Sequence, residues 1–133
     1  MNHEKEIIDL TFNFISWALF CVTFLVYALC IPNGITFWDS PEFIASNYKL
    51  QITHPAGAPF YTLLSNFLVG VFFFLKPATV SNLISAFFGA LTNPLIYRIT
   101  FLFSCKLIEK ENLRIAYTAG IVASLSFGFC NSF

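Results

Sequence analysis

Two carboxylates and a histidine lie in the only long polar stretch of the sequence, and they are the residues best suited to chemistry. Asp39 follows an aromatic residue and precedes Ser40-Pro41-Glu42, a pattern that predicts a helix with serine as its N-cap. A carboxylate held at such an edge can act as a general base towards an acceptor hydroxyl. From the residues alone, capping of the turn is favoured over catalysis, because loop aspartates often cap turns.

The other polar residues of this stretch each admit a binding role and a structural one. Glu42 suits the first turn of a helix because the helix dipole favours a carboxylate there. His54, beside Pro55, can hold a phosphate or carboxylate through a ring N–H, or simply satisfy nearby carbonyls. Lys49 can meet a lipid phosphate or lie on a solvated helix face. A lone histidine does not make a metal site, so none is predicted, and the need for a divalent cation stays open.

The composition of the chain indicates that its solvent is lipid. Of its 133 residues, 57% are hydrophobic and only 11% are charged, and the mean hydropathy is +0.73. Soluble domains carry about 25% charged residues, so an ordinary soluble enzyme is excluded. The net charge is zero, so the chain lacks the excess of basic residues that attracts a nucleic acid. The four cysteines show no C-x-x-C spacing and are interpreted as small hydrophobic residues.

Polar and apolar segments alternate in a pattern that predicts an all-α integral membrane fold with about three transmembrane helices. The expected order begins with a cytoplasmic tail at 1–13, a transmembrane helix at 14–31 and an outward loop at 32–77. That loop is expected to contain juxtamembrane or interfacial helices at about 41–50 and 59–75. A transmembrane helix at 78–104, a cytoplasmic loop at 105–114 and a truncated transmembrane helix at 115–133 complete the prediction.

The segment 59–75 decides between two topologies. As a helix it spans about 25 Å, against about 30 Å for the bilayer core. If it crosses, the basic residues of 105–114 fall outside, against the rule that lysine and arginine gather on the cytoplasmic side. If it lies in the interface, they fall inside, and Arg98 lies near the inner end of its helix. The second arrangement is therefore expected.

Two motifs of the outward loop resemble the start of a multispanning family. Its bacterial members are common in Bacteroidetes, and its animal relatives are protein O-mannosyltransferases that act on plexin and MET-type receptor ectodomains. The usual patterns are W-D-[SC]-G-E-F and H-P-P-G-A-P. This chain has proline at position 41 and alanine at position 56 instead, and otherwise reads Trp38-Asp39-Ser40-x-Glu42-Phe43 and His54-Pro55-x-Gly57-Ala58-Pro59.

The resemblance implies the N-terminal portion of a glycosyltransferase of the GT-C type. Such an enzyme transfers a hexose, here mannose, from a polyprenyl-phosphate carrier to a protein Ser or Thr hydroxyl on the periplasmic or lumenal side. No cofactor is implied, because the lipid-linked sugar is a substrate. The resemblance also covers Tyr48-Lys49-Leu50-Gln51. It implies catalytic roles for Asp39 and Glu42, and substrate-binding roles for Trp38, Lys49, His54, Pro55 and Gly57.

The implied partners are membrane lipids, the polyprenyl-phosphate sugar and an acceptor protein, and the implied location is a bacterial inner membrane, or the ER membrane in a eukaryote. Family members continue through many more spans. The 133 residues are therefore expected to be a fragment, inactive alone, that needs the remainder of the same protein or a partner membrane subunit. The alternative is a non-catalytic subunit or truncated remnant that acts only through helix packing.

Overall fold

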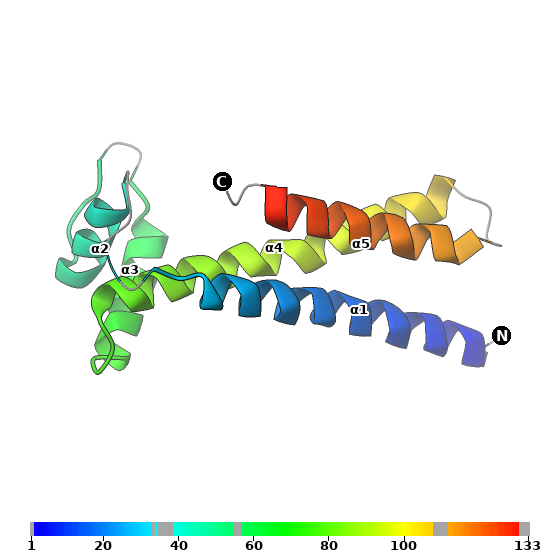
Figure 1. Cartoon of the computed structure of the whole chain (residues 1–133), viewed down its shortest axis with the longest axis horizontal. Coiled ribbons are helices and arrows are strands. Elements are labelled where there is room, and N and C mark those ends of the chain that lie inside the picture. The colour runs from blue at the N-terminus through cyan, green and yellow to red at the C-terminus, as the bar shows by residue number, and fades with distance from the viewer. Residues whose placement is uncertain (1, 33, 35–38, 55–56, 108–111, 131–133) are drawn as a thin grey trace. The chain divides into compact units, whose positions relative to one another are not determined.

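The computed structural model describes residues 2–32, 34, 39–54, 57–107 and 112–130. These residues form five α-helices and no β-strand, which confirms the predicted all-α class (Figure 1). In chain order the helices are α1 (Asn2–Leu29), α2 (Ser40–Lys49), α3 (Pro59–Val71), α4 (Pro77–Leu107) and α5 (Leu113–Cys130).

Three of the helices are long and apolar enough to cross a membrane, as the sequence predicted. They are the part of α1 at Glu6–Leu29, with 24 residues, α4 with 31 and α5 with 18. The helix α3 has only 13 residues, so it spans about 20 Å, less than the bilayer core of about 30 Å. It ends at Val71 rather than continuing to Leu75, because the chain turns at Phe72, whose carbonyl accepts from the Leu75 N–H at 2.9 Å.

One compact unit consists of Met1–Tyr27 and Phe88–Phe133, and polar bonds hold its three helices together. The amide of Asn93 on α4 donates to the hydroxyl of Thr23 on α1 at 2.7 Å. The hydroxyl of Ser124 on α5 donates to the Asn93 carbonyl at 2.9 Å. All three side chains are buried. In lipid the hydrophobic effect does not drive helices together, so such bonds and close packing carry the association.

Small residues let α5 approach α4 within this unit. Every fourth residue of one α5 face is small and buried, namely Ala116, Gly120, Ser124 and Gly128. A Cβ added at Gly120 would lie 2.8 Å from the ring of Tyr97, and one at Gly128 would collide with the amide of Asn93. The two glycines therefore set the distance between the backbones of the two helices.

The second compact unit, Ala28–Phe87, contains α2, α3 and the first turns of α4. Its apolar core is formed by Val69, Val80 and Ile84, with Tyr61 packed against it. Buried polar groups add to this core. The amide of Asn47 on α2 donates to the Ser81 hydroxyl on α4 at 3.1 Å, and the amide of Asn66 on α3 donates to the Asn47 carbonyl at 2.7 Å.

The two faces of α3 are reversed relative to a helix of a soluble protein. The exposed face carries the large apolar residues Phe60, Leu63 and Phe67. The buried face carries Thr62 and Ser65 together with Val69. An apolar face turned away from the protein is what lipid contact favours, whereas a soluble helix turns its apolar stripe inwards.

Candidate functional site

The helix α2 begins beside Asp39, whose side chain does not cap it. Asp39 occupies the N-cap position with helical dihedral angles, and its side chain makes no capping hydrogen bond. Its backbone carbonyl instead accepts from the N–H of Phe43 at 3.1 Å. The sequence predicted Ser40 as the N-cap, whereas Ser40 is the first helical residue. The carboxylate of Asp39 is exposed and does not cap the helix, which differs from the capping role that the residue pattern favoured.

Glu42 and His54 form a two-point contact beside Asp39. The backbone N–H of His54 donates to Oε1 of Glu42 at 2.6 Å, and Nδ1 of the ring lies 2.8 Å from Oε2. The hydrogen bond and the charge of Glu42 raise the pKa of His54 above its usual 6.5. The hydrogen bonds from His54 lower the pKa of Glu42 below its usual 4.5. Both shifts favour the ion pair, although both side chains remain open to solvent.

A left-handed residue lies on each side of His54, in the loop that returns this residue to the start of α2. Leu50 closes the helix with φ of 51°, and the next residue, Gln51, donates from its N–H to the Ser46 carbonyl at 3.1 Å. This is the Schellman pattern, which reverses the chain after a helix. Gly57 has φ of 56°, and its N–H donates to the His54 carbonyl at 2.9 Å. Glycine is suited to this position because L side chains are strained there.

The three predicted residues Asp39, Glu42 and His54 thus come together. One ligand-type atom from each lies within 4.8 Å of the other two. Such a donor set is compatible with a divalent cation, a need that the sequence left open. Glu42 and His54 already use donor atoms on each other, so we describe the cluster as an ion pair beside an open carboxylate.

The remaining predicted site residues lie away from this cluster or outside the residues that the structure describes. Lys49 is exposed in the last turn of α2, about 10 Å along the helix axis from Glu42 at 1.5 Å per residue. Gly57 contributes through the turn that presents His54. Trp38 and Pro55, predicted to bind substrate, lie outside the described residues.

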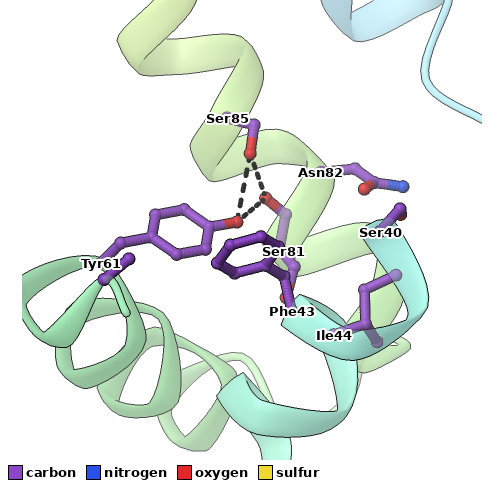
Figure 2. Close-up of a pocket in the computed structure, with 8 residues that line it drawn as sticks. Ser40, Phe43, Ile44, Tyr61, Ser81, Asn82 and Ser85 are labelled. Atoms are coloured by element: carbon purple, nitrogen blue, oxygen red, sulfur yellow. Dashed lines mark hydrogen bonds between the residues drawn. The ribbon is translucent and has the colours of Figure 1, made fainter. Parts of the chain in front are cut away.

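A cavity of about 480 Å³ between α2, α3 and α4 was not predicted from the sequence. Figure 2 shows the Tyr61 ring reaching from α3 towards α4, where its hydroxyl lies 3.1 Å from the hydroxyl of Ser85. The only sign of this cavity in the sequence is the group of polar residues Ser81, Asn82 and Ser85 near the start of α4. The side chains that give this cavity its polar and aromatic character are Ser40, Phe43, Tyr61, Ser81, Asn82 and Ser85.

Comparison with known proteins supplies the family. Residues 39–133 match the family model described as the N-terminal domain of the protein O-mannosyl-transferase TMEM260. The mouse protein O-mannosyl-transferase TMEM260 is 30% identical over 114 residues, which cover 86% of this chain and 15% of that relative. No solved structure matches. The matched region starts at Asp39 and includes Glu42 and His54. The chain belongs to the TMEM260 N-terminal domain family of protein O-mannosyl-transferases.

Proposed function

We propose that this chain is part of a membrane glycosyltransferase of the GT-C type, which transfers mannose from a polyprenyl-phosphate carrier to a protein Ser or Thr hydroxyl on the outer side. The family membership and the name of the mouse relative support the reaction class. The three long apolar helices support a membrane-embedded donor. Since the chain spans 15% of that relative, we assign the complete activity only to the protein that contains this region.

The clustering of Asp39, Glu42 and His54 within 4.8 Å carries the proposal. Asp39 is the proposed general base, because its carboxylate is exposed and makes no capping bond. Glu42 was expected as a second catalytic carboxylate. We now assign it as a positioning residue, because both of its oxygens face His54. This contact raises the pKa of His54 and so favours the protonated imidazole, whose Nε2–H is proposed to donate to the phosphate of the carrier.

The proposed step is an inverting displacement. The acceptor oxygen forms a bond to the anomeric carbon while the bond from that carbon to the phosphate oxygen breaks. The electron pair of the broken bond leaves with the phosphate, where protonated His54 stabilises the charge. The proton of the acceptor hydroxyl passes to Asp39, which requires an oxygen-to-oxygen distance of about 3 Å.

The rest of the second unit is proposed to hold this cluster at the membrane surface. The exposed apolar face of α3, with Phe60, Leu63 and Phe67, suits the interface of the outer leaflet. Lys49 is exposed at the far end of α2 and is proposed to contact a lipid phosphate. Trp38, Pro55 and Gly57 complete the proposed substrate-binding set, by the family resemblance of their motifs.

The substitution Asp39→Asn tests the proposal, because it keeps the size of the side chain and removes the base. In the complete protein that contains this region, we expect transfer of labelled mannose from polyprenyl phosphate to a Ser/Thr peptide to fall about 10²- to 10⁴-fold, with normal expression in the membranes. The matched control is Glu6→Gln, an exposed carboxylate on α1, which should leave transfer unchanged. Normal transfer by Asp39→Asn would remove this residue from the mechanism.

A further inference from the structure

We propose that the cavity between α2, α3 and α4 holds the hexose ring of the lipid-linked donor. The inference rests on the proposed function, and it adds a sugar subsite to the charged cluster. The cavity is open to solvent and has a volume of about 480 Å³ (Figure 2), within the range of about 300–1,000 Å³ that is typical of small-molecule sites. All the residues that line it belong to the second unit.

The uncharged lining of the cavity favours a neutral ligand. Among the residues that the structure describes, no aspartate, glutamate, lysine, arginine or histidine lines it. A phosphate would be held by charged or strongly donating partners, and these are absent from the lining. A polyhydroxylated neutral molecule needs hydroxyl and amide partners, which the lining provides.

Aromatic rings and hydroxyls are arranged for a ligand with one apolar face and one polar edge. The rings of Phe43 and Tyr61 meet edge to face, with centroids 5.9 Å apart at 82°. They offer apolar surface to the C–H face of a sugar ring. Beside them, the Tyr61 hydroxyl lies 3.3 Å from the Ser81 carbonyl and 3.1 Å from the Ser85 hydroxyl. A pyranose has this amphipathic character.

The polar groups of the cavity retain hydrogen-bonding capacity. The Ser85 hydroxyl donates to the Ser81 carbonyl of its own helix at 3.2 Å, so its lone pairs can still accept. The Asn82 amide is 3.5 Å from the Pro32 carbonyl, which is a long and weak contact. A hexose hydroxyl can therefore replace or extend these bonds without leaving a buried group unpaired.

The cavity adjoins the charged cluster through α2. Ser40, which lines the cavity, directly follows Asp39 in the chain. Phe43 lines it as well, and its ring centroid lies 6.2 Å from that of His54. A sugar in the cavity would thus lie next to the segments that carry Asp39 and His54, as the proposed displacement requires.

Binding to lipid phosphates with and without the sugar tests this subsite. The probes are a short-chain mannosyl phosphoryl polyprenol and the same polyprenyl phosphate without mannose, titrated against the detergent-solubilised complete protein that contains this region. We expect Tyr61→Phe and Asn82→Ala each to weaken binding of the mannosylated lipid about five- to tenfold, with binding of the bare phosphate unchanged. Tyr61→Phe keeps the ring and so protects the packing of α3.

The control is Thr118→Ala on α5, an exposed hydroxyl that lies outside the cavity and donates to the Arg114 and Ile115 carbonyls of its own helix. It should leave binding of both lipids unchanged. An equal loss of both lipids in Tyr61→Phe and Asn82→Ala, or no loss of either, would overturn the subsite.

Transfer assays separate the subsite from the proposed function. If the unaltered protein transfers mannose and both variants keep their affinity and KM for the donor, the subsite is wrong and the function stands. If mannose strengthens binding through Tyr61 and Asn82 but no sugar reaches the peptide, the subsite stands and the function is wrong.

Discussion

His54 contacts both carboxylate oxygens of Glu42, with its backbone N–H at 2.6 Å from Oε1 and its ring Nδ1 at 2.8 Å from Oε2. The contact joins the first turn of α2 to a loop residue that comes after the helix has ended. The two contacts hold the Glu42 carboxylate, and the single contact at Nδ1 leaves Nε2 of the imidazole available to another partner. Because this contact raises the pKa of His54, titration of the histidine reports directly on whether the contact forms.

The pH dependence of this contact has two limbs. The pKa of His54 is raised above 6.5, so its stabilising contribution is complete below about 6.5 and is lost as the pH rises through the folded value. The pKa of Glu42 is lowered below 4.5, so its contribution is complete above about 4.5 and is lost as the pH falls through the folded value. We expect the contact between Glu42 and His54 to be most stable between about pH 4.5 and about pH 6.5.

NMR titration of labelled histidine checks this expectation, with His3 as the second histidine signal of the chain. The His54 midpoint should lie above 6.5 and should fall in Glu42→Gln, which removes the charge but keeps the size. A midpoint that does not change in Glu42→Gln would show that the ion pair does not form.

The turn that presents His54 gives a second prediction. Gly57 has φ of 56°, where an L side chain is strained by about 1–2 kcal/mol. Gly57→Ala should therefore loosen the turn and shift the His54 midpoint towards 6.5. Gly57→Asn should shift it less, because asparagine tolerates the left-handed region. Equal effects of the two substitutions would contradict the backbone explanation.

The helices could be predicted from the sequence, whereas the return of His54 to Glu42 could not. Long apolar runs predict α1, α4 and α5, because a bilayer sets their length. The return depends on Leu50 in a left-handed conformation, which leucine rarely adopts, so no local pattern announces it. The sequence therefore names candidate residues but does not indicate that Glu42 and His54 are in contact.

The sequence shows only one half of the cavity and one half of the tight helix contact. Ser81 and Ser85 are one turn apart on α4, but the partner that closes the cavity, Tyr61, is on another helix. On α5, the glycines Gly120 and Gly128 indicate close helix packing in the sequence, but they do not indicate that α4 is the helix they contact. In both cases one half of the contact is visible in the sequence and the other half depends on tertiary structure.

The packing of α5 against α4 gives a third prediction. A Cβ at Gly128 would collide with the buried amide of Asn93, so Gly128→Ala should destabilise the first unit by about 1–3 kcal/mol. The matched control is Gly70→Ala on α3, where nothing lies within 4 Å of the added Cβ. It should be neutral or slightly stabilising, because alanine favours helix. Thermal unfolding in detergent measures both, and equal melting temperatures would contradict the close contact.

The membrane orientation of the second unit gives the last prediction. The helix α3 has 13 residues and is too short to cross the bilayer, and its large apolar side chains lie on an exposed face. If it lies in the outer interface, then α1 and α4 are the only crossings between the N-terminus and residue 112. Gln51 would then face outwards and Asn112 inwards, with most lysine and arginine residues on the inner side.

Labelling with an impermeant maleimide separates the possibilities. The four cysteines, at positions 21, 30, 105 and 130, are free and can be replaced by alanine before one new cysteine is placed at an exposed position. We expect Gln51→Cys to react on intact cells and Asn112→Cys only after permeabilisation. If both react on intact cells, α3 crosses the membrane. If Gln51→Cys reacts only after permeabilisation, Asp39 faces the cytoplasm, where an outward-facing sugar carrier cannot meet it.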